Sequence, residues 1–110
     1  MNFHQEGVRV GPCAYGLGVF SLRTFSPKRL IGRIPGEIHR DPDYGSDYCM
    51  ELGDHTALEP DPPFRYLNHS CQPNCALVEV EVEHENGSRA GWEIWLEALR
   101  DIAPGEQMTI

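Results

Sequence analysis

The chain has 110 residues, and 40% of them are hydrophobic, which indicates one folded domain with one modest core and argues against disorder. Nine Lys and Arg residues stand against 17 Asp and Glu residues, so the net charge is −8. This acidity argues against a direct nucleic-acid partner, because phosphate binding needs a basic face, and it suits a cationic partner such as a lysine-rich peptide.

No apolar run is long enough to span a membrane, and residues 1–6 lack the basic-then-apolar pattern of a signal peptide. We therefore expect an intracellular protein, cytoplasmic or nuclear, that is not secreted and has no membrane partner. In that setting cysteines are normally reduced thiols. The chain has four of them, Cys13, Cys49, Cys71 and Cys75.

The first third of the chain predicts short strands separated by glycine and proline turns. Alternation over residues 8–10 predicts a strand that ends at Gly11-Pro12. Two glycines flank Leu17, and such a turn lets the backbone approach a ligand without intervening side chains. Ser26-Pro27 predicts the start of one helical turn, and residues 30–34 are apolar enough for a buried strand.

The middle third carries a predicted hairpin and a polar loop. Pro35-Gly36 predicts a turn, and residues 39–46 predict a surface loop that could form a partner-specific edge. Residues 48–52 and 55–58 predict the two strands of a hairpin. Residues 59–63 predict an extended, proline-rich linker.

We call residues 65–75 the central stretch. It is polar and interrupted by Pro73, so it predicts an irregular, hydrogen-bonded loop between strands. Residues 77–83 then alternate valine with glutamate, which predicts a strand with the valine face buried. Residues 92–99 predict its partner, and residues 107–110 open a last strand, so the fold class is mainly β.

The residues of the central stretch leave four interpretations open. A zinc site would use His69, Cys71 and Cys75, although no Cys-x-x-Cys pair exists. A cysteine nucleophile with His69 as base lacks an acid to orient the histidine. The loop would otherwise be structural, or Asn68 and His69 would form a ligand pocket with the backbone of residues 16–18.

The central stretch resembles the R-[FY]-[IL]-N-H-S-C-x-P-N signature of SET-domain protein-lysine methyltransferases, and every fixed position matches. Three further segments resemble the family's motifs and follow in its order. They are Gly16-Leu17-Gly18-Val19-Phe20, Pro35-Gly36-Glu37-Ile38, and the segment from Ala98 to Thr109. The resemblance covers about residues 7 to 110.

The resemblance implies a SET-domain, β-clip-like fold, with short strands in several small curved sheets and little helix. It also implies a pseudoknot-like crossing, in which the C-terminal segment threads under a loop beside the central stretch. Residues 1–110 would form a single minimal SET domain without pre-SET or post-SET regions, and without the extreme C-terminal end of the domain.

The resemblance further implies S-adenosylmethionine as cofactor and a lysine-bearing basic protein or peptide as substrate. The backbone of the glycine turn would hold the methionine part of the cofactor, Asn68 its amino-acid end, and the His69 backbone its adenine. The cofactor-binding residues implied in this way are Gly16, Leu17, Gly18, Arg65, Tyr66, Asn68 and His69.

The chain departs from the family pattern in three ways. The family's channel tyrosine follows the last motif, beyond Ile110, so no catalytic residue is assigned. Gly32-Arg33 replaces an E-Y pair and removes an aromatic residue on the cofactor side. Without further cysteine clusters we expect no metal, and we expect Cys71 to be a buried thiol. An alternative function is a non-catalytic module that binds cofactor or protein, and a third is a structural domain without cofactor.

Overall fold

The structure is a computed structural model, and it describes residues 7–14, 16–41, 43–46, 48–53, 56–83 and 89–110. The elements are β1 (Val8–Cys13), β2 (Gly16–Ser21), β3 (Leu30–Arg33), β4 (Gly36–His39), β5 (Met50–Gly53), β6 (Thr56–Pro60), η1 (Phe64–Tyr66), β7 (Cys75–Glu83), β8 (Arg89–Ala98) and β9 (Gln107–Met108). The helical element η1 is a single 3₁₀ turn.

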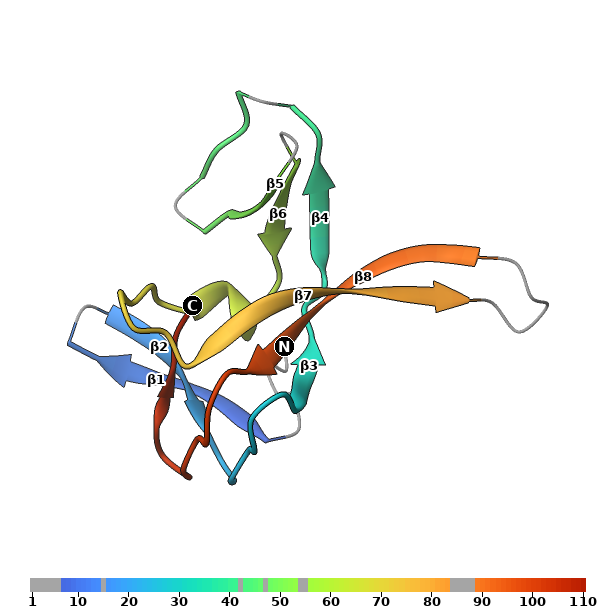
Figure 1. The fold of residues 1–110 in the computed structure, drawn as a ribbon. Coiled ribbons are helices and arrows are strands. Elements are labelled where there is room, and N and C mark those ends of the chain that lie inside the picture. Colours follow the sequence, from blue (N-terminus) through green and yellow to red (C-terminus); the bar gives the residue numbers. More distant parts are fainter. Residues whose placement is uncertain (1–6, 15, 42, 47, 54–55, 84–88) are drawn as a thin grey trace.

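The strands form three small antiparallel sheets with the orders β1-β2-β9, β3-β8-β7 and β4-β6-β5 (Figure 1). This arrangement confirms the predicted mainly β fold with little helix. In the ranges that the structure describes, no helix has the length and apolar character needed to cross a membrane.

One hydrophobic core joins the three sheets. Each sheet contributes buried side chains to it, and Phe25 and Phe64 add two fully buried rings from the connecting segments. The fully buried members with the largest side chains are Phe25, Phe64, Leu58, Leu96, Ile102 and Met108. Small sheets of this kind have little core of their own, so their packing on one another stabilises all three.

Two local predictions in the first third were wrong. Strand β1 continues through Gly11-Pro12, where Pro12 lies opposite Leu17. It can do so because β1 is an edge strand, in which a missing N–H need not break a ladder. Residues 26–29 form a turn and no helix, because Lys28 has a φ of +69° and the Arg29 N–H donates to the Ser26 carbonyl (3.1 Å).

The β7–β8 hairpin alternates as predicted, but a different face meets the core. Cys75 pairs with Ala98 and Leu77 with Leu96, and these side chains face the core, so the valines at positions 78, 80 and 82 lie on the opposite face. Those valines are half-buried. The hairpin projects from the body of the molecule (Figure 1), so only its base can contribute to the core.

The C-terminal segment crosses the central stretch. The Ile110 N–H donates to the Asn68 carbonyl and the Ser70 N–H to the Ile110 carbonyl, both at 3.0 Å. The Cys75 N–H donates to the Thr109 carbonyl at 3.0 Å, while β9 pairs with β2. Residues 107–110 are therefore enclosed between β2 and the central stretch, which matches the expected crossing.

Candidate functional site

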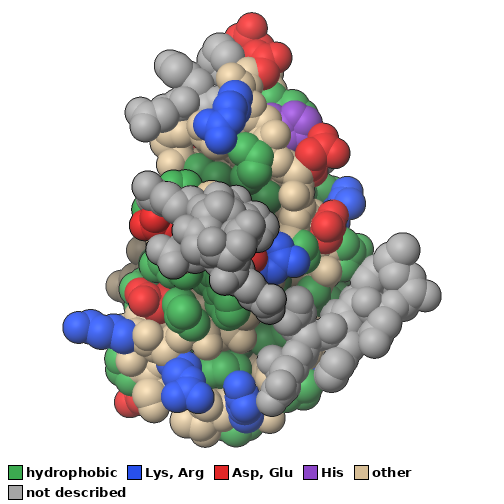
Figure 2. Space-filling view, turned by 90° about the vertical axis from the view of Figure 1, so that its right-hand side faces the viewer, with side chains coloured by type: hydrophobic (Ala, Val, Ile, Leu, Met, Phe, Trp, Pro, Cys, Tyr) green, Lys and Arg blue, Asp and Glu red, His purple; other side chains and the backbone are tan. Residues whose placement is uncertain are grey.

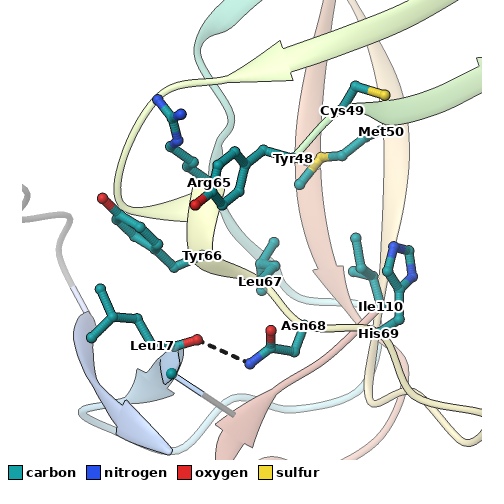
Figure 3. Close-up of a pocket in the computed structure, with 11 residues that line it drawn as sticks. Leu17, Tyr48, Cys49, Met50, Arg65, Tyr66, Leu67, Asn68, His69 and Ile110 are labelled. Carbon is teal, nitrogen blue, oxygen red and sulfur yellow. Dashed lines mark hydrogen bonds between the residues drawn. The ribbon is translucent and has the colours of Figure 1, made fainter. Parts of the chain in front are cut away.

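A cavity of about 310 Å³ opens beside this crossing (Figure 3). Four separate parts of the chain build it: the start of β2, the approach to β5, the η1 turn with the residues after it, and the C-terminal residue. The lining residues are Gly16, Leu17, Tyr48, Cys49, Met50, Arg65, Tyr66, Leu67, Asn68, His69 and Ile110. We call this the crossing cavity.

Six of the seven cofactor residues expected from the sequence line the crossing cavity, and Gly18 is the exception. Gly18 is buried behind the wall, where the chain approaches two side chains closely. A Cβ at this position would lie 2.6 Å from Gln107 Oε1 and 3.3 Å from the Asn68 amide nitrogen. Glycine therefore makes room for the Asn68 amide against β2.

Asn68 fastens the central stretch to the glycine turn. Its amide nitrogen donates to the Leu17 carbonyl (3.1 Å) and to Gln107 Oε1 (3.0 Å), and it lies 3.5 Å from Cys13 Sγ. In Figure 3 the amide oxygen points away from Leu17. The side chain thus holds the wall together through its nitrogen and leaves its oxygen, an acceptor, for other contacts.

An aromatic and cationic wall closes one side of the crossing cavity. The Arg65 guanidinium lies 4.3 Å from the centre of the Tyr48 ring, a cation–π geometry, and Tyr48 meets Tyr66 edge-on at 6.3 Å. Sequence reasoning identified Arg65 and Tyr66 but missed Tyr48, Cys49 and Met50. No spacing signal links residues 48–50 to the central stretch, because only the tertiary fold brings them together.

A hydrogen-bond chain holds the segment that carries Tyr48. Tyr44 and Ser46 both donate to Glu59 Oε1, at 2.9 and 2.6 Å, and Ser46 Oγ accepts from the N–H groups of Tyr48 and Cys49, at 3.2 and 3.1 Å. The Ser46 hydroxyl is the main cause that holds the pKa of Glu59 below its ordinary value, against the opposing effect of burial. This polar loop, expected as a partner edge, thus positions a wall of the crossing cavity.

The other interpretations of the central stretch find less support in the geometry. Cys71 is exposed, so its predicted burial was wrong: it lies in a bend of the loop, whereas Cys75 enters β7 and the core. Burial raises the pKa of Cys75 to about 12, which keeps it from the thiolate form that nucleophiles and metal ligands need. Among the described residues, no group of three or more His, Cys, Asp or Glu side chains could hold a metal ion.

Comparison with known families decides the relationship. The SET domain family profile matches residues 16–110. The chain belongs to the SET domain family. The match includes the glycine turn, the central stretch and the C-terminal crossing, so it covers every residue that lines the crossing cavity.

Two curated relatives share parts of this SET domain. A histone-lysine N-methyltransferase of Chaetomium globosum, named as specific for H3 lysine 4, is 38% identical over 68 residues, covering 59% of this chain and 6% of the relative. The Saccharomyces cerevisiae enzyme of the same name is 29% identical over 107 residues, covering 84% of this chain and 9% of the relative. The chain therefore spans less than a tenth of either relative.

The fold also matches solved structures. The Chaetomium thermophilum polycomb repressive complex 2 aligns with a TM-score of 0.73 at 20% identity, over 97% of this chain and 15% of that chain. At this identity the likeness concerns the fold alone. It shows that the three small sheets and the C-terminal crossing form a known architecture.

Proposed function

We propose that this SET domain binds S-adenosylmethionine in the crossing cavity and transfers its methyl group to lysine side chains of a protein substrate. The observation that carries the proposal is the convergence of Gly16, Leu17, Asn68 and His69 on one cavity, although the chain separates the two pairs widely. Membership of the family and the names of the relatives support the reaction type.

The cavity fits the proposed cofactor in size and in chemistry. Its volume of about 310 Å³ lies at the lower end of the range for small-molecule sites. Backbone groups at Gly16 and Leu17, an amide at Asn68 and aromatic rings at Tyr48 and Tyr66 provide polar contacts and flat apolar surface. A Cβ at Gly18 would crowd the Gln107 and Asn68 side chains, which fits their close packing against β2 in this wall.

When bound, the cofactor would supply an electrophilic methyl group on a sulfonium. The chain's own residues would position it: Asn68 at the amino-acid end, the Gly16-Leu17 backbone along the methionine part, and the His69 backbone at the adenine. Arg65 and Tyr66 would support that wall. Enclosure at the crossing would exclude water and keep an incoming lysine amine neutral and aligned, which accounts for much of the rate in such transfers. No catalytic residue is assigned.

The charge distribution supports a basic protein substrate. Residues 36–98, which include the β4-β6-β5 sheet and the β7–β8 hairpin, contain 14 acidic side chains against three basic ones. Such an excess attracts a cationic polypeptide. The relatives are named for histone H3, so a basic, histone-like substrate and an intracellular setting belong to this proposal. That residues 1–110 form a single minimal SET domain stays a prediction.

Asn68→Ala tests the proposal. We expect isothermal titration with S-adenosylmethionine, and with its demethylated product, to show binding to the chain and loss of binding to the variant, while the fold survives. Gln72→Ala, an exposed change in the same loop, is the matched control and should bind normally. If Asn68→Ala melts early but its folded fraction binds the cofactor normally, Asn68 is a structural cap.

A methyl-transfer assay on a panel of basic proteins separates enzyme from binding module. We expect radiolabel on lysine in the presence of the chain and less of it with Asn68→Ala. Cofactor binding without any transfer would favour the non-catalytic module. If neither S-adenosylmethionine nor its demethylated product binds, the chain is a structural domain without cofactor.

A further inference from the structure

A groove leads away from the crossing cavity between β5 and β7. A second cavity of about 400 Å³ shares Cys49, Met50, His69 and Ile110 with the crossing cavity. Its remaining lining residues are Glu51 and Leu77, which lie on β5 and β7. The hollow surface therefore continues past the C-terminal residue along these two strands.

A third hollow, of about 540 Å³, is lined by the next residues of both strands. Leu52 and Gly53 follow Glu51 along β5, and Glu79 follows Leu77 on the same face of β7. Its lining residues are Ile38, Arg40, Leu52, Gly53, Thr56, Glu79, Gly91, Trp92 and Ile94. We call the second and third hollows together the β5–β7 groove.

The far end of the groove is a place where two core faces diverge. On the β4-β6-β5 sheet, Met50 and Leu58 are buried, while Ile38, which pairs opposite Leu58, is 44% exposed. On β8, Ile94 is buried, while Trp92 on the same face is 60% exposed. Each apolar face thus runs on beyond the core and lacks a covering layer. Exposed apolar surface of this kind commonly marks a binding site.

Charge and position indicate what occupies this groove. Glu51 and Glu79 line it, and Glu81 pairs opposite Trp92 across the hairpin, so its sides favour a cationic chain. Arg40 lines the far end, where basic groups are therefore disfavoured. The side of the molecule toward which the hairpin projects carries both hydrophobic and charged side chains (Figure 2). An extended basic polypeptide with one apolar side chain suits this pattern.

We propose that the β5–β7 groove binds the substrate polypeptide at a distance from the target lysine, with an apolar side chain seated between Trp92 and Ile38. The inference rests on the proposed function, because the proposed function places the target lysine at the crossing cavity. Met50, which lines the crossing cavity, and Ile38 both pair opposite Leu58, so they lie two strand spacings apart, or roughly 10 Å, where an extended chain rises about 3.3 Å per residue. The apolar side chain therefore lies about three or four residues from the lysine.

Peptide binding to the full chain tests this inference. The probes are labelled peptides with a central lysine, arginines around it and one leucine, which is moved through each position on both sides. We expect leucine about three or four residues from the lysine to tighten binding about tenfold, measured by fluorescence anisotropy. Trp92→Ala should remove this preference without changing the Kd for S-adenosylmethionine. Leu22→Ala, which shortens another exposed apolar side chain outside the groove, should keep it.

Glu79→Gln provides a second variant. It should weaken binding of the arginine-containing peptides and leave the leucine preference in place, because it removes a charge and spares the apolar faces. The inference is overturned if leucine tightens binding equally at every position, if the preference persists in Trp92→Ala, or if no peptide binds. Self-association in sedimentation that Trp92→Ala abolishes also overturns it, by placing a second copy in the groove.

The cofactor titration separates this inference from the function on which it rests. If S-adenosylmethionine does not bind but the Trp92-dependent leucine preference is present, the cofactor proposal fails and the groove is retained as a peptide site. If the cofactor binds and the preference is absent, the groove is wrong and the cofactor site stands.

Discussion

Asn74 is a buried side chain that ties the central stretch to the C-terminal segment. Its amide nitrogen donates to the Gln107 carbonyl (2.8 Å) and, more weakly, to Glu106 Oε2 (3.3 Å), and its oxygen accepts from the Thr109 N–H (2.8 Å). The side chain, which is itself buried, thereby satisfies two backbone groups of the C-terminal segment. Asn74 and Asn68 thus both bind Gln107 and hold the C-terminal segment at the crossing.

We expect Asn74→Ala to lower the free energy of unfolding by about 3 kcal/mol, because it leaves the Gln107 carbonyl and the Thr109 N–H without partners. Chemical denaturation with matched slopes measures the loss. Gln72→Ala, two residues earlier and exposed, should change stability by less than about 0.5 kcal/mol. A loss for Asn74→Ala as small as that of the control would mean that the crossing does not depend on this side chain.

At the scale of an element, one carboxylate closes the turn at residues 103–106. Glu106 accepts from the Ala103 N–H (3.0 Å) and from the Arg100 guanidinium (2.6 Å). The Ala103 N–H first, and Arg100 next, hold the pKa of Glu106 below its ordinary 4.5. The turn leads into β9 at the crossing, so the hydrogen bonds that close the turn affect the site without lying in the cavity.

When folding lowers the pKa of a carboxyl group, its ionised form stabilises the folded chain. This contribution is present above the pKa of the unfolded state and is lost as the pH falls through the pKa of the folded state. We therefore expect Glu106→Gln to be less stable than the parent at pH 7 and to approach it below pH 4.5. Thermal unfolding across this range measures the convergence, with the exposed Asp101→Asn as control. A constant gap at every pH would mean that the Glu106 charge does not stabilise the turn.

At the scale of the whole molecule, the two cysteines of the central stretch report whether the domain opens as one unit. Cys75 is 1% exposed at the point where β7 enters the shared core, and Cys71 is exposed four positions earlier. Burial raises the pKa of the Cys75 thiol to about 12. Its reaction with an alkylating agent therefore needs the core to open.

We expect iodoacetamide at pH 8 to label Cys71 at least about a hundredfold faster than Cys75 in the folded chain. Denaturant should make the two rates similar. Tandem mass spectrometry distinguishes the positions, and Cys71→Ser isolates the slow reaction of Cys75. Equal rates without denaturant would mean that the base of the hairpin opens independently of the rest.

The amino-acid sequence by itself determined the local features of this protein. Glycine and proline turns, alternating strands and the irregular central stretch follow from backbone preferences and side-chain periodicity, which act over a few residues. The ordered motifs identified the family and six residues of the crossing cavity. The sequence alone provides these signals because each depends on residues that are neighbours along the chain.

Only the tertiary structure decided which distant parts meet. Alternation shows that two faces of β7 differ, but the packing of the base of the hairpin decided that Cys75 and Leu77 face the core. Nothing near Tyr48 indicates that it lies beneath Arg65, and Asn68 reaches Leu17 across 51 positions. Such contacts depend on how three small sheets share one core, which local preferences do not encode.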